Sequence, residues 1–265
     1  MKEFLSVNEF SKMSGIAAST LRYWDEIGLF SPAKRDPENN YRYYVPFQII
    51  AVNFITVLSS LNVPLKEISK MEGIRNPENI IDLIEEQENL LDLEMSRLRE
   101  SYSIIHTRRR LIKSGMKAHV DEIEVVRYPD TAIILGPHNN FKEDEAFYEP
   151  FMRFCNAADD MRINLNYPIG GYHEKVDTWR KMPGRPDNFF SIDPTGNSVR
   201  AAGKYLVGHT RGYYGEFGDM PERMLEYAEK HSLTLKGPVY VVFLHDEICV
   251  KDPEQYLSRI SIAIE

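Results

Sequence analysis

The residue types best suited to bind a nucleic acid are concentrated near the start of the 265-residue chain. An arginine can form two parallel hydrogen bonds with guanine, whereas hydroxyl groups and lysines contact phosphates or base edges. The candidate side chains are Ser19, Thr20, Arg22, Tyr23, Arg35, Tyr41, Arg42 and Lys66. Their types and spacing predict contacts with the backbone and the base edges of a DNA duplex.

Local sequence signals predict two short helices around the first of these residues. Ser6 and Glu9 have the capping-box spacing before a helix at residues 7–14. We expect Ser19 to cap a second helix, which Gly28 ends. Two short helices joined by a tight turn are typical of a helix-turn-helix, whose second helix lies in the major groove of DNA.

The next segment predicts a β-hairpin, the wing of a winged helix-turn-helix. Pro32 and Pro37 exclude a helix, and Asn39 with Asn40 favours a turn because asparagine tolerates the left-handed region. Alternation over residues 41–45 predicts a strand. A further helix follows, with an expected buried face of Ile49, Ile50, Phe54, Val57, Leu58 and Leu61.

A sustained heptad pattern follows this region. Residues 78–114 contain neither proline nor glycine, and apolar side chains recur there every seven positions. They are Ile84, Leu91, Leu98, Ile105 and Ile112. The pattern predicts one helix of about ten turns in a coiled coil. Because no second segment matches its length, we expect the partner to be a second copy of the chain, although a long helix within one domain is an alternative.

After Gly115 the pattern changes to short strands and amphipathic helices. Strands are predicted within residues 122–135, and helices near 144–160 and 219–231. The order β-α-β-β occurs twice, which predicts an α+β domain with an internal duplication. Trp179 falls in a segment punctuated by Pro and Gly (residues 177–187), where we expect a loop whose large indole either covers a ligand or anchors the loop by packing.

Aromatic side chains are dense in this part of the chain. Aromatic faces stack on planar rings and attract organic cations, and a nearby carboxylate adds selectivity for positive charge. Many of these residues must also serve as core. The candidate ligand-binding residues are Phe147, Tyr148, Phe151, Tyr172, Trp179, Tyr213, Tyr214, Tyr240, Glu247 and Tyr256.

Charge and composition narrow the class of protein. The net charge of −8 resides in residues 119–265, whereas residues 1–75 carry +1, so local contacts rather than a broad basic patch must bind phosphate. The two cysteines lie far apart, and no Cys/His cluster has metal-ligand spacing, which predicts neither a disulfide framework nor a metal or cofactor site. With no signal peptide or membrane-spanning run, we expect a cytoplasmic protein without a membrane partner.

The run TLRYWDEIGLFSPAKRDPENNYRYY resembles the signature of the MerR family, and the resemblance covers about residues 5–114. Trp24 and Asn40 depart from the usual Tyr and Gly of that signature. The resemblance implies a homodimer joined by an antiparallel coiled coil that binds double-stranded promoter DNA. It also implies distortion of the promoter spacer so that RNA polymerase engages both of its elements, which is indirect readout used as a switch.

Residues 120–265 resemble the GyrI-like effector domain of the multidrug-sensing branch, in GYYGEFGDMPERM and in the tail from GPVYVV onward. The resemblance implies a pocket, lined by Tyr148 and Tyr256, for a lipophilic aromatic effector that is neutral or cationic. Relatives that bind cations have a buried Glu where this chain has Val241. Glu247, or Glu145 and Glu149, could supply the charge instead.

We therefore predict three parts: a winged helix-turn-helix at residues 1–75, a dimerisation helix at 76–118 and a GyrI-like effector domain at 119–265. The predicted function is ligand-responsive transcription regulation without catalytic residues. Two alternatives remain. One is hydrolysis of a small molecule by Glu247 with Tyr148 or Tyr213. The other is a DNA-bound module that senses a peptide or a protein.

Overall fold

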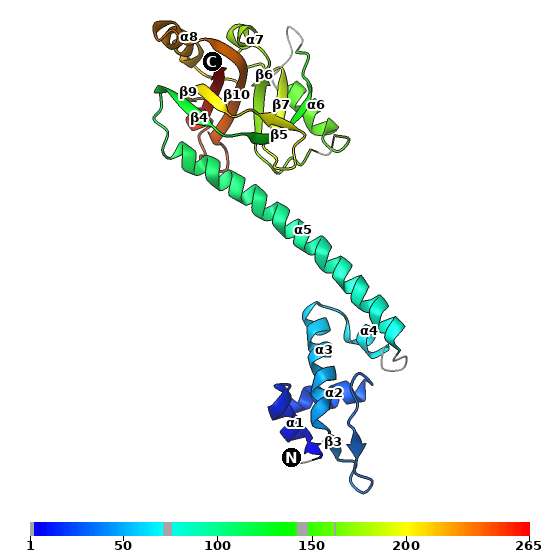
Figure 1. Ribbon diagram of the computed structural model, residues 1–265. Helices are drawn as coiled ribbons and strands as arrows, with labels where there is room; N and C mark the ends of the chain where they lie inside the picture. Colours follow the sequence, from blue (N-terminus) through cyan, green and yellow to red (C-terminus); the bar gives the residue numbers. More distant parts are fainter. Residues whose placement is uncertain (1–2, 71–75, 142–147, 162) are drawn as a thin grey trace. The chain divides into compact units, whose positions relative to one another are not determined.

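The computed structural model describes residues 3–70, 76–141, 148–161 and 163–265. The chain divides into two compact units, Met1–Met95 and Ser96–Glu265. The long helix α5 (Pro77–Gly115) begins in the first unit and ends in the second (Figure 1). The segment 76–118, which we expected to form a separate dimerisation helix, is thus divided between the two units. Within the described ranges no helix has the length and apolarity needed to cross a membrane.

The first unit begins with the predicted helix pair, α1 (Val7–Ser14) and α2 (Ala18–Glu26). The capping box of Ser6 and Glu9 is confirmed, and Gly15 ends α1 in the left-handed conformation. The expected cap at Ser19 is wrong. Helix α2 begins at Ala18, two residues before the expected start, with Ala17 in the cap position and no side-chain hydrogen bond, so Ser19 already lies in the first helical turn.

The predicted hairpin is also confirmed. Strands β2 (Lys34–Arg35) and β3 (Arg42–Tyr44) pair antiparallel, and β3 also pairs with β1 (Leu5–Ser6). Asn40 has a φ of 58°, as its position in the turn requires. The rings of Phe10, Phe30 and Tyr44 stack beneath this sheet, with 4.7 Å between the centroids of Phe10 and Tyr44.

After a 3-10 turn (Pro46–Gln48) come α3 (Ile49–Ser60) and α4 (Leu65–Lys70). The predicted buried face of α3 is confirmed in part: Leu58 lies in the core, with Phe54 and Leu61 packed against it, but Ile50 and Val57 do not. Of that set only Leu58 is fully buried, whereas Ile50 and Val57 are 69% and 55% exposed. Helix α3 is apolar on most sides, and packing against α1 and α2 selects the face that carries Val52 and Ile55.

The second unit is built on an antiparallel sheet of eight strands in the order β4-β9-β11-β10-β6-β7-β5-β8. Its strands are β4 (Ile123–Tyr128), β5 (Thr131–His138), β6 (Ile169–His173), β7 (Asn188–Ser191), β8 (Ser198–Arg200), β9 (Gly203–Arg211), β10 (Leu235–His245) and β11 (Leu257–Ile264). Its helices are α6 (Tyr148–Ala157), α7 (Val176–Lys181) and α8 (Met220–Lys230), with a 3-10 turn at Pro253–Gln255. The α+β prediction is confirmed.

The strand order of the sheet is symmetric about its centre. Each strand of the first half of the domain takes the place that its equivalent in the second half takes when the sheet is followed from the other edge. The halves are β4-β5-α6-β6-β7 and β8-β9-α8-β10-β11, and their first strands change places: β4 pairs with β9 and β8 with β5. Strands β8 and β9 are close in sequence and yet lie in different parts of the sheet.

The sheet curls until its two edges meet at the short turns that follow β4 and β8. The Ala202 N–H donates a hydrogen bond to Asp130, and the Arg200 guanidinium lies 4.5 Å from the ring centre of Tyr128. Helices α6, α7 and α8 lie on the outside of the curl (Figure 1). The inside is closed by the end of α5, whose Leu111 packs with Tyr240 and neighbouring residues.

The expectation of a loop around Trp179 is wrong. The segment contains α7, and Trp179 is fully buried between this helix and the outer face of the sheet. Pro183 and Gly184 come only after the helix has ended. Val176 and Trp179, three residues apart, place their side chains on the same side of this short helix, so both pack into the outer-face core.

Candidate effector pocket and nucleic-acid interface

Helix α2 presents the predicted nucleic-acid contacts on one exposed side. Ser19, Arg22 and Tyr23 are exposed and have the i, i+3, i+4 spacing of a helix face, and Thr20 beside them is half-buried. Tyr23 is 51% exposed. The side chains that the motif would direct at DNA are therefore available to solvent on the second helix.

The two arginines of the hairpin have a structural partner that the sequence did not reveal. Arg35 donates two hydrogen bonds of 2.6 and 2.7 Å to the carboxylate of Asp25, and Arg42 donates a third from Nε. Asp25 is buried on α2, and its hydrogen bond raises the pKa of Arg42. The three side chains fix the hairpin to α2, whereas Tyr41 and Lys66 remain exposed.

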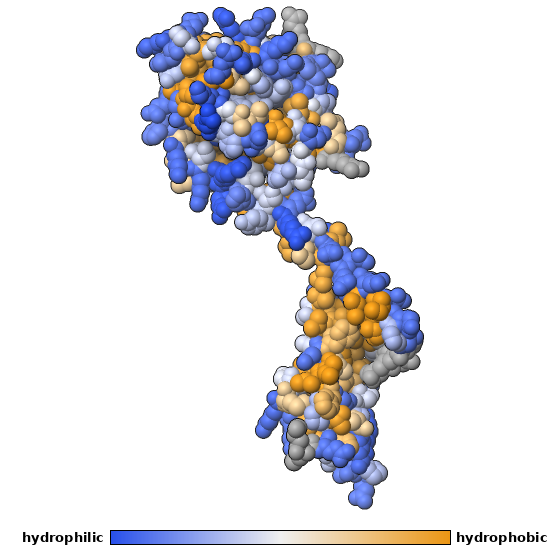
Figure 2. Space-filling model, in the orientation of Figure 1, coloured by the Kyte–Doolittle hydropathy of each residue, from blue (hydrophilic) through white to orange (hydrophobic). Residues whose placement is uncertain are grey.

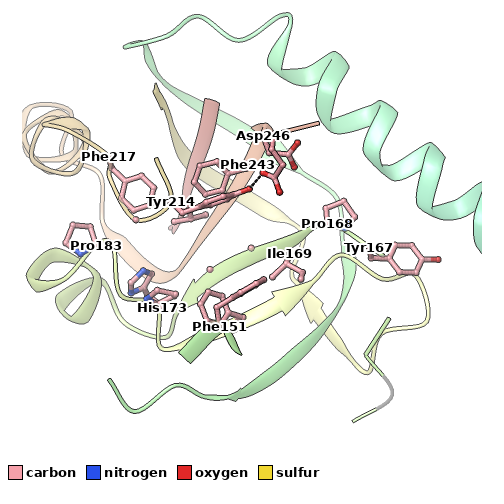
Figure 3. Close-up of a pocket in the computed structure, with 18 of the residues that line it drawn as sticks. Phe151, Tyr167, Pro168, Ile169, His173, Pro183, Tyr214, Phe217, Phe243 and Asp246 are labelled. Atoms are coloured by element: carbon pink, nitrogen blue, oxygen red, sulfur yellow. Dashed lines mark hydrogen bonds between the residues drawn. The ribbon is translucent and has the colours of Figure 1, made fainter. Parts of the chain in front are cut away.

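The second unit contains a cavity of about 320 Å³ on the outer face of its sheet (Figure 3). Its floor is formed by Gly171 and His173 of β6 and by Val241 of β10. Aromatic rings from α6, β7, β10 and the segment before α8 form its walls. The residues that line it include Arg108, Phe151, His173, Phe189, Tyr214, Phe217, Val241, Phe243, Asp246 and Glu247.

Two carboxylates stand at one end of this outer cavity, just after β10. Asp246 forms an ion pair of 3.2 Å with Arg108 of α5, and Glu247 accepts a hydrogen bond from the Tyr214 hydroxyl. Burial and this hydrogen bond to Glu247 raise the pKa of Tyr214 above its ordinary value. Tyr214 is therefore protonated at neutral pH, which makes it a hydrogen-bond donor rather than a nucleophile.

His173 adds no positive charge to the outer cavity. Its side chain is 1% exposed, and burial lowers its pKa from 6.5 to about 4. The imidazole is thus neutral at pH 7. Among the described lining residues, Arg108 therefore carries the positive charge, and it already forms an ion pair with Asp246.

The structure brings some of the predicted effector residues together and separates others. Phe151, Tyr214 and Glu247 line the outer cavity, and so does Val241. Tyr213 and Tyr256 pack against Tyr214, with ring centroids 5.3 and 5.5 Å away. The predicted cluster is therefore present in part, as a wall of the cavity and a layer that supports it.

The remaining predicted residues lie elsewhere. Tyr172 and Tyr240 pair on the inner face of the sheet, and Trp179 is core. Tyr148 is 64% exposed, and Phe147 falls outside the described residues, as does Glu145. Neighbours on a strand point to opposite faces, so Tyr240 faces away from the cavity that Val241 lines.

Sequence reasoning missed Arg108, Asp246, Phe217 and Phe243. Phe217 and Phe243 could have been found by following the alternation along β10 and the apolar residues before α8. The ion pair joins residues 138 positions apart, so no local signal could have indicated it.

Comparison with known proteins agrees with this architecture. The model of "MerR family regulatory protein" matches residues 6–44. The multidrug-efflux transporter 1 regulator of Bacillus subtilis (strain 168) is 31% identical over all of this chain and 99% of its own length. The multidrug-efflux transporter 2 regulator of the same organism is 24% identical over 100% and 98%.

A solved structure of EcmrR with DNA covers 98% of this chain and 99% of its own, at 18% identity and a TM-score of 0.38, a likeness too distant to support further conclusions. The match to the transporter 1 regulator is different, because it extends over both chains at 31% identity. With the helix-turn-helix matched by the family model, this chain belongs to the MerR family of transcription regulators.

Proposed function

We propose that the chain is a homodimeric promoter-binding regulator of the bacterial cytoplasm that responds to a lipophilic cation bound in the outer cavity. The two Bacillus relatives are named as regulators of multidrug-efflux transporters. The duplicated, curled sheet supports a GyrI-like effector domain. The observation that carries the proposal is an aromatic cavity whose carboxylate, Asp246, is paired with Arg108 of α5.

The chemistry of the outer cavity favours a cation with a bulky apolar body. Rings such as Phe151, Phe217 and Phe243 supply apolar contact and negative π faces. Asp246 and Glu247 supply negative charge at one end. A volume of about 320 Å³ lies within the range of small-molecule pockets.

The ion pair offers a route from the cavity to the long helix. A cation near Asp246 competes with Arg108 for the carboxylate and weakens the attachment of α5 at this point. Helix α5 begins in the unit that carries the helix-turn-helix. A ligand that binds one position of α5 better than another shifts the population of positions by its difference in affinity.

Calorimetric titration of the full chain tests the ligand class. Tetraphenylphosphonium is the cationic probe, and triphenylphosphine oxide is the uncharged one. We expect the cation to bind at least about tenfold more tightly, and Asp246→Asn to remove about that factor. Glu254→Gln, an exposed acid outside the cavity, is the matched control. Equal affinity for both probes, or no effect of Asp246→Asn, would contradict the proposal.

The DNA-binding part is tested on duplexes selected by the native protein from a random pool. We propose that Ser19, Thr20, Arg22 and Tyr23 contact the major groove, with Tyr41 and Lys66 on phosphates. Arg35 and Arg42 hold the hairpin through Asp25 and direct their remaining N–H groups to the phosphate backbone of the DNA.

We expect Arg22→Ala to lower affinity for the selected duplex by about tenfold, since a bidentate contact to guanine contributes about 1–3 kcal/mol. The control is Lys117→Ala, which removes an exposed positive charge just after α5. Equal losses in the two variants would indicate general electrostatics instead of recognition by α2.

The dimer is supported by apolar side chains that the chain leaves uncovered. On α5 Leu91, Leu98 and Ile105 are 40%, 60% and 67% exposed, and Phe47 and Ile50 near the start of α3 are 82% and 69% exposed. Figure 2 shows this apolar surface over α3 and the first half of α5. An uncovered stripe of this length is typical of a protein-protein contact.

Light scattering during size-exclusion chromatography tests the dimer. We expect a dimer for the native chain and a monomer for the double variant Leu91→Lys, Leu98→Lys. The double variant Asp82→Lys, Glu86→Lys changes charge on the opposite side of the same helix and serves as control. A native monomer would contradict the proposal.

A further inference from the structure

A second cavity, of about 220 Å³, lies on the inner face of the curled sheet, apart from the proposed effector site. It forms where the two sheet edges meet, and the end of α5 covers it. The lining residues from the sheet include Tyr128, Arg200 and Arg259, and α5 contributes Arg110 and Leu111. This inner cavity therefore has arginines where the outer cavity has carboxylates.

Two of these arginines lie over one aromatic ring. The guanidinium carbon of Arg200 is 4.5 Å from the ring centre of Tyr128, and that of Arg259 is 5.3 Å from the same centre. Arg200 also donates a 2.9 Å hydrogen bond to the Thr131 hydroxyl. The two side chains come from β8 and β11 and meet here because the sheet curls.

The charge of this pair is not balanced by a lining acid. No carboxylate is among the described residues that line the inner cavity. Asp130, in the adjoining turn, accepts a hydrogen bond from the backbone N–H of Ala202. Burial and the neighbouring Arg259 lower the pKa of Arg200, which shows that the folded chain disfavours its charge here.

Hydrogen-bond donors are also left unused. The Nε atoms of Arg200 and Arg259 are buried and, within the described part of the chain, have no hydrogen-bond partner. Buried donors without partners are uncommon in folded proteins. Arginine presents its N–H groups in a planar fork that matches a carboxylate or a phosphate. An anion in this cavity would offset the repulsion between the two guanidinium groups.

The rest of the cavity wall is apolar. Phe190, Ile192, Tyr240 and Val242 are each less than 9% exposed and line the space beside the arginines. A fully polar ion such as inorganic phosphate would leave these walls without contact. A flat hydrocarbon body attached to the anionic group would cover them.

We infer that the inner cavity is a second ligand site that takes an organic anion, an aromatic monocarboxylate held by Arg200 and Arg259. Its ring lies against Phe190 and Tyr240. Because Arg110 and Leu111 belong to α5, the anion contacts the same helix that Arg108 joins to the outer cavity.

Calorimetry with 2-naphthoate on the full chain tests the inference, and 2-naphthamide is the uncharged probe. We expect naphthoate to bind at least about tenfold more tightly than the amide, and Arg259→Gln to remove about that factor, as expected for a charge-assisted pair. Arg127→Gln, an exposed arginine of β4 that does not line the cavity, is the matched control.

The outcomes separate this inference from the proposed effector site. Tetraphenylphosphonium affinity should change by less than about twofold in Arg259→Gln if the two sites are distinct. Arg259→Lys keeps the charge without the fork and should bind naphthoate with intermediate affinity, which guards against a variant that fails to fold. Equal binding of naphthoate and naphthamide, tighter binding of phenyl phosphate than of naphthoate, or equal losses in Arg127→Gln would overturn the inference.

Discussion

The outer and inner cavities are lined by the same central strand and yet carry opposite charge. Val241 and Phe243 of β10 face the outer cavity. Tyr240 and Val242, which alternate with them along the strand, face the inner one. The outer cavity ends in carboxylates at Asp246 and Glu247, whereas Arg200 and Arg259 line the inner cavity. One sheet thus separates two chemically different spaces.

The comparison shows that aromatic content alone does not define a binding site in this domain. Both faces are rich in rings, so the charged residues that line each cavity distinguish them. The end of α5 contacts both spaces, through Arg108 on one side and Arg110 with Leu111 on the other. A ligand in either cavity would therefore contact the same part of α5.

The most severe test of this separation uses two adjacent residues that are each 4% exposed. Val241→Phe should fill part of the outer cavity and lower tetraphenylphosphonium affinity by more than about tenfold, with naphthoate nearly unchanged. Val242→Phe should do the reverse. Calorimetry with both probes on both variants measures the effect.

Each of these substitutions overpacks a buried site and is expected to lower stability by about 1–3 kcal/mol. Thermal unfolding should therefore show a similar loss in the two variants, which makes each the control for the other. If either variant loses both ligands, the cavities are not independent.

Each face also carries a buried histidine, which predicts a pH dependence of stability. Burial lowers the pKa of His173 on the outer face, and burial with Arg259 lowers that of His209 on the inner face, each to about 4. Each of these histidines binds a proton near pH 6.5 in the unfolded chain but only near pH 4 in the folded chain. The free energy of unfolding should therefore be highest above pH 6.5 and fall toward pH 4, by at most about 1.4 kcal/mol per pH unit for each histidine.

Urea unfolding at several pH values measures this slope. His173→Gln and His209→Gln should each reduce the slope by about one histidine's share, and exposed His231→Gln should leave it unchanged. A steeper fall in the variants than in the native chain would contradict the assignment of neutral buried imidazoles.

The smallest expected effect concerns Tyr214→Phe. The change removes the hydrogen bond to Glu247 and leaves that exposed carboxylate freer to attract a cation. We expect tetraphenylphosphonium affinity to rise by about threefold, less than a full charged hydrogen bond because water screens Glu247. Tyr213→Phe is the control, and naphthoate affinity should stay constant. A loss of cation affinity would show that Tyr214 positions the carboxylate.

Local sequence signals were sufficient for much of the first unit and for α5. Ser6, Glu9 and Gly15 act through hydrogen bonds and backbone angles within a few residues, so their positions specify α1. The heptad pattern predicted α5 because a helix depends on contacts between near neighbours in sequence. In the candidate pocket, residue type alone identified Phe151, Tyr214 and Glu247.

Only the tertiary structure decided which of two plausible faces is buried and which distant charges meet. Helix α3 is apolar on most sides, and Trp179 belongs to the core because it lies on the side of a short helix that packs against the sheet. Arg108 with Asp246, and Arg200 with Arg259, come together through a sheet whose strands exchange between halves. Pairings across such separations depend on topology, which the residues of any one segment do not determine.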